Sequence, residues 1–261
     1  MSYSTINTAK CAISKLAKTV DGRNIGTDPD ICTFMRGIFE LRTPAPKVNK
    51  TWDTAVLLEH FRSIPNNEEL KLKDLTKKLS ALLMIESAQR VQTLSIMKTS
   101  DIKWYENSCT ILVSEKVKQT RPGYHLPAKS FEKKSDDIKV CVYSCLKHYT
   151  DRTSEFRKEH RKLFLCYKKP YRPASKDTIA KWLEKSLRDA GIENYTSHSY
   201  RSAATSEMFN SGIGMQTILK TAGWTNENTF RKYYLKKVDK EALRGAKSNC
   251  QKTMLNYFQP K

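Results

Sequence analysis

Residues suited to chemistry on a phosphodiester recur at four places along the chain. They are Arg90 in ESAQRVQTL, Lys118 in SEKVKQTRPGYHLP, His198 and Arg201 in TSHSYRSAATSEM, and Trp224 with Tyr233 and Tyr234 in AGWTNENTFRKYY. Phosphodiester exchange without a metal needs positive donors aimed at the non-bridging oxygens, because negative charge builds there in the transition state. Two arginines supply planar donor groups that bind phosphate through paired hydrogen bonds.

The same set contains a nucleophile and groups that can move protons. A phenol can attack phosphorus and leave again, and the reaction also needs an acid to protonate the departing 5′ oxygen. Each residue alone has an ordinary explanation, such as a surface arginine for Arg90, a helix cap for His198, core packing for Trp224 or a solvated charge for Lys118. The ordered set is more specific than any one of its members.

The elements that must position these residues are mostly helical. Apolar spacing predicts helices over 3–20 and 28–42, and RTPAPKVNKTWD reads as a linker. Residues 110–114 and 123–127 flank a basic turn and predict a β-hairpin. We therefore expect a mainly α-helical protein with a small antiparallel β-sheet. The further expected helices are 54–64, 72–88, 139–153, 175–191, 198–212, 215–223 and 226–238.

Composition narrows the class of protein. Lys and Arg total 47 against 27 acidic residues, a net charge of +20 spread along the whole chain, which favours a folded surface that binds a polyanion. Seven cysteines without a CxxC pair indicate neither a disulfide framework nor a zinc cluster. No apolar run reaches the ~20 residues of a membrane span. We expect a soluble, intracellular protein.

The motifs resemble those of the tyrosine recombinase superfamily, and within it the recombinases of DIRS, Ngaro and Crypton mobile elements. The resemblance rests on AQRVQTL, VKQTRPGYHLP, SHSYRSAATSE and AGWTNENTFRKYY, with SYSTINTAKCAIS matching the core-binding domain. It implies a two-domain, C-shaped clamp on DNA. Residues 1–46 would form a partial core-binding domain that begins inside its usual bounds, residues 47–245 the catalytic domain, and residues 246–261 a tail.

The resemblance also implies a role for each matching residue. Arg90 and Arg201 would bind the scissile phosphate, His198 would assist proton transfer from the tyrosine, and Trp224 would contact a phosphate oxygen through its indole N–H. Lys118 would be the general acid, with Lys116 the next candidate. Where the superfamily often has an acidic residue a turn after the first arginine, this chain has Thr93.

Two neighbouring tyrosines compete for the role of nucleophile. Tyr233 has the spacing from Trp224 found in Cre-like phage recombinases, whereas the Thr229–Phe230 match favours the mobile-element register and Tyr234. Successive helix residues point about 100° apart, so one of the two can face the phosphate. Tyr234 is the preferred nucleophile and Tyr233 the alternative.

The C-terminal residues carry a second motif, QKTMLNYF. Its members Gln251, Met254, Tyr257 and Phe258 resemble the PCNA-interacting peptide, which inserts an aliphatic and two aromatic side chains into a pocket of the sliding clamp. The alternative is a segment that docks on a neighbouring protomer, as the superfamily's C-terminal helices do.

The resemblance implies double-stranded DNA as the partner, with a dimer or tetramer assembled on it, and PCNA as a further partner. It implies no metal, nucleotide or other cofactor, no membrane and a nuclear location. One alternative is a catalytically inactive DNA-binding protein derived from such a recombinase. A metal-dependent nuclease would need clustered carboxylates, and Asp101, Asp136 and Asp137 show no such arrangement with the arginines.

Overall fold

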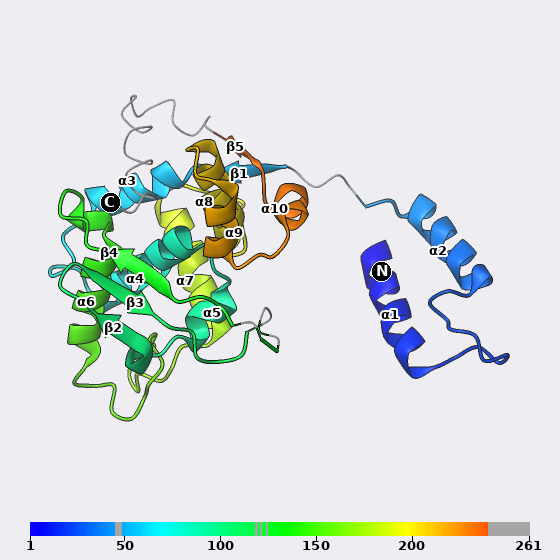
Figure 1. Cartoon of the computed structure of the whole chain (residues 1–261), viewed down its shortest axis with the longest axis horizontal. Helices are drawn as coiled ribbons and strands as arrows, with labels where there is room; N and C mark the ends of the chain where they lie inside the picture. Colours follow the sequence, from blue (N-terminus) through cyan, green and yellow to red (C-terminus); the bar gives the residue numbers. More distant parts are fainter. Residues whose placement is uncertain (45–48, 118–119, 121, 124, 240–261) are drawn as a thin grey trace. The chain divides into compact units, whose positions relative to one another are not determined.

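Two compact units divide the computed structural model of the chain, Met1–Asn49 and Lys50–Lys261, here called the N-terminal and C-terminal units (Figure 1). The structure describes residues 1–44, 49–117, 120, 122–123 and 125–239. Lys118 and the whole QKTMLNYF motif lie outside the described residues.

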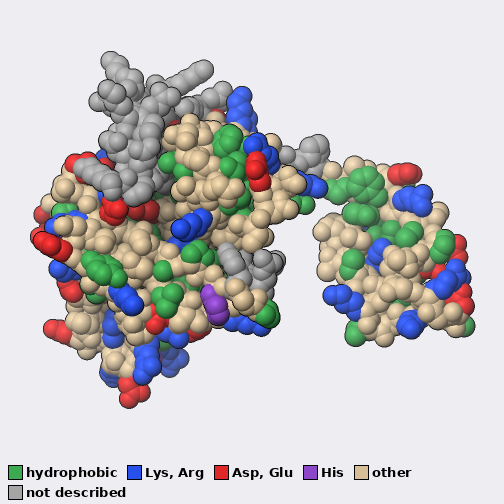
Figure 2. All heavy atoms as spheres, in the orientation of Figure 1, with side chains coloured by type: hydrophobic (Ala, Val, Ile, Leu, Met, Phe, Trp, Pro, Cys, Tyr) green, Lys and Arg blue, Asp and Glu red, His purple; other side chains and the backbone are tan. Residues whose placement is uncertain are grey.

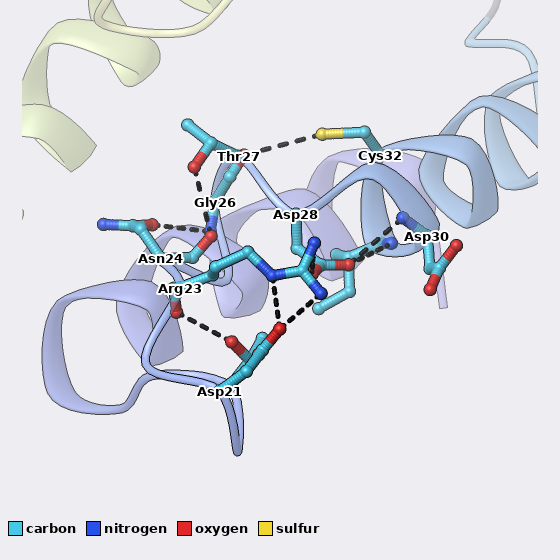
Figure 3. A network of polar contacts seen from close by, with 10 residues as sticks. Asp21, Arg23, Asn24, Gly26, Thr27, Asp28, Asp30 and Cys32 are labelled. Atoms are coloured by element: carbon cyan, nitrogen blue, oxygen red, sulfur yellow. Dashed lines mark hydrogen bonds and ion pairs between the residues drawn. The ribbon is translucent and has the colours of Figure 1, made fainter.

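The N-terminal unit is a pair of helices, α1 (Tyr3–Leu16) and α2 (Pro29–Leu41). The Asp28 carboxylate caps α2 by accepting from the backbone N–H groups of Asp30 and Ile31, which leaves Pro29 at the first turn, where no amide is needed. The connection between the helices is held by short-range contacts (Figure 3): the Arg23 guanidinium pairs with Asp21, and the Asn24 side chain accepts from the Gly26 N–H. The predicted first helix is thus confirmed, ending at Leu16.

The C-terminal unit is built around one buried helix, α4 (Leu72–Ser87), which packs against α6, α7 and α8. Most of its side chains are buried, including Leu75, Leu79 and Leu82, so it forms the centre of the core. The other helices are α3 (Thr54–Ser63), α5 (Val91–Ile96), α6 (Val142–Thr153), α7 (Lys176–Asp189), α8 (Ser199–Asn210), α9 (Met215–Ala222) and α10 (Glu227–Tyr233), with short 3-10 turns at Thr99–Asp101 and Ile138–Val140. Figure 1 shows α8, α9 and α10 grouped together, and the sheet beside α6.

A three-stranded antiparallel sheet joins β2 (Ile102–Trp104), β3 (Ser108–Ile111) and β4 (Lys129–Glu132) in that order. The predicted second strand at 123–127 is wrong, because β3 pairs instead with β4, where Cys109 faces Phe131. The reason is burial: Lys129 and Phe131 point inward while Ser130 and Glu132 are exposed, an alternation that suits one buried sheet face. The expectation of a mainly helical fold with a small antiparallel sheet is confirmed.

A second, smaller sheet was not predicted. β1 (Lys50–Trp52) and β5 (Lys237–Asp239) pair in parallel, with Thr51 opposite Val238. The Trp52 indole N–H donates to the Ser199 hydroxyl at 2.8 Å, and its ring packs edge-on against Tyr200. The start of this unit is therefore fastened both to α8 and to the strand that follows α10.

Within the described ranges, no helix is both long and apolar enough to cross a bilayer. The same part of the chain holds no group of three or more His, Cys, Asp or Glu side chains placed to bind a metal ion.

Candidate active site

The first arginine of the set lies at a sharp turn between α4 and α5. α4 ends in Ala88, whose backbone is left-handed (φ 49°), and Arg90 is the residue that precedes the first turn of α5. Ala88 is fully buried, so the chain reverses inside the protein and its carbonyl needs a partner there. That partner is the second arginine.

Arg201 is buried in the first turn of α8 and connects three segments. One terminal nitrogen of its guanidinium donates to the Ala88 carbonyl at 3.0 Å, and the other donates to the Ala222 carbonyl at the end of α9 at 2.8 Å. The predicted pair of arginines is thereby brought together, because Ala88 is two residues from Arg90 and the Arg90 charge acts on Arg201.

Trp224 is positioned by the end of α9. Gly223 ends this helix in the left-handed region (φ 69°), and the Trp224 N–H returns to the Leu219 carbonyl at 2.8 Å. The indole then lies under the Arg201 guanidinium, 4.3 Å from its central carbon to the ring centroid. Trp224 is buried in a small cluster with Phe230, so its ring is fixed on both sides.

The two tyrosines at the end of α10 have different surroundings. The centroid of the Tyr234 ring lies 4.5 Å from the centroid of the Trp224 ring. The same centroid lies 5.3 Å from the central carbon of the Arg201 guanidinium. The Tyr234 backbone is held by the Ser206 hydroxyl, which donates to its carbonyl at 3.0 Å. Tyr233 is 60 % exposed and contacts Lys232. The structure therefore places Tyr234, the preferred residue, beside the arginine and the tryptophan.

The site is rich in buried donors that have no acceptor. Arg90 Nη1, Arg201 Nε and Trp224 Nε1 are buried, and none has a hydrogen-bond partner among the residues that the structure describes. Burial, followed by the nearby charge of Arg90, lowers the pKa of Arg201 to about 9, which the Tyr234 phenol partly opposes. Buried donors of this kind are costly unless something binds them. Because all three groups are N–H donors and two of them are positively charged, the ligand that suits them is an anion.

The other two predicted residues are His198 and Lys118, and within the part of the chain that the structure describes no side-chain hydrogen bond or ion pair joins His198 to this group. His198 is exposed at the start of α8, three positions before Arg201 and so on the same side of the helix. Lys118 lies outside the described residues, and the alternative, Lys116, is exposed. Neither role is tested by the geometry, and both stay predictions.

Sequence reasoning missed two buried polar residues that meet the end of α9. Lys129 on β4 donates to the Thr221 carbonyl at 2.8 Å and approaches the Lys220 carbonyl at 3.4 Å. The Gln89 side-chain amide, between Ala88 and Arg90, donates to the same Thr221 carbonyl at 2.7 Å. Nothing in the local sequence distinguishes Lys129 from its many basic neighbours, whereas Gln89 had a signal in its place beside Arg90.

Residues 58–241 match the phage integrase family. The chain belongs to this family. The matched region holds Arg90, Arg201, Trp224 and Tyr234, together with the sheet that carries Lys129.

Solved structures of tyrosine recombinases share the fold of this phage integrase family member. XerH site-specific recombinase in a post-cleavage complex with palindromic difH substrate has a TM-score of 0.60 at 16% identity, over 88% of this chain and 63% of that chain. The Tn1549 transposon integrase with circular intermediate DNA has 0.58 at 16%, over 90% and 75%, and XerA recombinase has 0.53 at 15%, over 100% and 84%.

These likenesses show the fold alone, since the identities are low. The chain spans 58% of the length of the XerH chain in its pre-cleavage complex with difH substrate. Among curated proteins, no sequence match was found.

Proposed function

We propose that this phage integrase family member is a tyrosine recombinase that cuts and rejoins duplex DNA through a transient 3′-phosphotyrosine bond. The observation that carries the proposal is the set of three buried donors on Arg90, Arg201 and Trp224 that have no partner among the described residues. Arg201 and Trp224 lie beside the Tyr234 ring, and the charge of Arg90 acts on Arg201. A scissile phosphate offers two non-bridging oxygens that can accept from all three donors.

The proposed reaction gives each of these groups one role. The Tyr234 oxygen attacks phosphorus, His198 takes the phenolic proton, and the bond to the 5′ oxygen of the next nucleotide breaks. Lys118 protonates that departing oxygen. Because one phosphodiester replaces another, the 5′ hydroxyl can later attack the phosphotyrosine and restore the DNA without a nucleotide or a metal.

The charge of the chain supports duplex DNA as the substrate. Figure 2 shows Lys and Arg side chains scattered over the visible faces of both units, interspersed with acidic ones. The whole sequence has a net charge of +20. Such a surface binds a phosphate backbone without needing its sequence. The solved structures of XerH and the Tn1549 integrase contain DNA, and assembly of this chain as a dimer or tetramer on paired sites is part of the proposal.

The finer identity proposed is a mobile-element recombinase of the DIRS, Ngaro or Crypton type, acting in the nucleus. The QKTMLNYF tail would then bring PCNA to the recombination complex, by the resemblance of Gln251, Met254, Tyr257 and Phe258 to the clamp-binding peptide.

Trapping a covalent adduct tests the function. The protein is incubated in EDTA with nicked duplexes whose cleavage releases a short 5′ fragment, using sites selected from a random library for binding. We expect a protein–DNA adduct with wild type and with Tyr233→Phe, and none with Tyr234→Phe, which keeps DNA binding. An adduct lost only in Tyr233→Phe would reverse the assignment of the nucleophile. Binding without any adduct would favour the inactive DNA-binding protein, and cleavage that EDTA abolishes would favour a metal-dependent nuclease.

A further inference from the structure

The C-terminal end of α9 accepts hydrogen bonds from buried side chains of other elements. Its last carbonyls accept from three separate elements: Gln89 from the α4–α5 turn, Arg201 from α8 and Lys129 from β4. A helix C-terminus presents carbonyls that the helix itself cannot satisfy and concentrates partial negative charge there. Positive donors are therefore stabilising at this end of α9.

Lys129 differs from an ordinary helix-capping lysine in its burial. Lys129 is only 6 % exposed. Its buried ammonium group lies close to the positive charges of Arg201 and Lys220. Burial first, and then those two positive charges, lower its pKa to about 8. A methionine or leucine would fill such a position in a sheet without this cost, so packing alone does not explain a lysine there.

The hydrogen bond from Lys129 lies close in sequence to the Trp224 indole. The carbonyl that Lys129 holds belongs to Thr221, two residues before Gly223 and three before Trp224. Arg201 holds the next carbonyl, that of Ala222. Movement of the α9 terminus would therefore displace two of the groups that face Tyr234 at once.

We propose that Lys129 is a positioning residue, which clamps the C-terminus of α9 and so sets Trp224 and Arg201 in place for the scissile phosphate. This inference rests on the proposed function for its catalytic consequence, but the clamp itself is a property of the DNA-free protein. Lys129 touches the α9 carbonyls and is distinct from the proton donor assigned to Lys118.

Substitution at this position separates charge from hydrogen bonding. Lys129→Met keeps the length of the side chain and removes both, and Lys129→Gln keeps an N–H donor without a titrating charge. Lys133→Met is the matched control, since Lys133 is an exposed lysine directly after the same strand. All three are made in the full chain.

Hydrogen exchange of the amides at the end of α9 measures the clamp without any reaction. The Trp224 N–H is bonded to the Leu219 carbonyl, and the Gly223 N–H to that of Lys220. Because Lys129→Met removes a charge-assisted hydrogen bond from this helix end, it should speed the exchange of these amides by about tenfold or more at fixed pH. Lys129→Gln should lie between Met and wild type, and Lys133→Met should match wild type.

Single-turnover adduct formation measures the catalytic consequence. We expect Lys129→Met to slow cleavage about tenfold or more, with partial recovery in Lys129→Gln. When most of the DNA is unbound, the rate reports the protonation state of the free protein. Under these conditions the wild-type rate should fall as the pH rises through about 8, because the Lys129 ammonium then loses its proton. Lys129→Gln should lack this step. The charged groups that face Lys129 are Arg201 on α8 and Lys220 on α9.

The outcomes are distinguishable. Normal exchange and normal cleavage in Lys129→Met would overturn the inference, as would a step near pH 8 that persists in Lys129→Gln. Slow cleavage with unchanged exchange, restored by a 5′-phosphorothiolate substrate whose sulfur leaves without an acid, would make Lys129 the proton donor instead. If wild type forms no adduct, the proposed function fails, and the exchange experiment still decides the clamp. If Lys129→Met does not fold, Lys129→Gln and the wild-type pH profile carry the test.

Discussion

Replacing Trp224 by phenylalanine should reduce cleavage strongly while changing the stability of the DNA-free protein little. The indole Nε1 is buried and has no acceptor among the residues that the structure describes, and removing such a donor relieves roughly 1–3 kcal/mol. Against this stand the smaller buried area of a phenyl ring, about 1 kcal/mol, and a weaker attraction for the Arg201 guanidinium, about 0.5–1 kcal/mol. These contributions nearly cancel, so the free energy of unfolding should change by no more than about 1 kcal/mol.

In the cleavage reaction, no favourable contribution offsets the loss of the indole N–H. The indole N–H would donate to an ionised phosphate oxygen, an interaction of roughly 1.5–3 kcal/mol. Its loss corresponds to a rate about 10- to 100-fold lower, since each 1.36 kcal/mol is tenfold. Trp224→His should recover part of that rate, because an imidazole N–H can donate in the same direction.

The assay pairs urea unfolding, followed by circular dichroism, with single-turnover cleavage of a nicked duplex. Trp104→Phe is the matched control, because Trp104 is 40 % exposed on β2 and packs against Tyr143. Wild-type cleavage in Trp224→Phe would refute the use of the indole N–H. A loss of stability above about 3 kcal/mol would show that Trp224 serves mainly as core packing, and any slower cleavage would then follow from unfolding.

Four further experiments test other parts of the site and the chain. Arg201→Ala should abolish cleavage and also destabilise the C-terminal unit by about 2 kcal/mol or more in urea unfolding, because two buried carbonyls lose their donors, and an unchanged midpoint would contradict those contacts. Lys118→Ala should slow cleavage of an ordinary substrate and be rescued by a 5′-phosphorothiolate, whereas failure of rescue would move the acid role elsewhere. Affinity for any duplex should fall steeply with salt as counterions are released, and a flat log–log plot would argue against extensive backbone contact. A peptide of residues 250–261 should bind PCNA by calorimetry and lose most of that binding when its two adjacent aromatic residues become alanine; no binding, with tail deletion abolishing assembly on DNA, would identify an intersubunit segment instead.

Helical periodicity was enough to predict the main helices, because each buries one face and shows it as regular spacing. The sheet was predicted with the wrong partner strand, since the apolar residues at 123–127 resemble a strand as well as the true one at 129–132 does. The β1–β5 pair is three residues long on each side and joins segments far apart in the sequence, so no local signal marks it.

The candidate site was predictable where a motif fixed the spacing. Arg201, Trp224 and Tyr234 stand together as expected, and the preference for Tyr234 agrees with its contacts. Lys129 could not be predicted, because its burial depends on the approach of α9 from about ninety residues away, and a lysine in a basic segment ordinarily faces solvent.

The parallel pairing of β1 with β5 has a mechanical consequence. The chain enters the pair at Lys50 and leaves it at Asp239, at opposite ends of two strands that run in the same direction. Tension applied between these points pulls the strands along their axes, so their hydrogen bonds are loaded together in shear instead of being opened one after another. The load passes from one strand to the other before it reaches α10, and Tyr234 is shielded from force transmitted along the chain. Single-molecule stretching between handles at residues 50 and 239 should therefore meet a higher rupture force than stretching between residues 50 and 210, which bypasses β5.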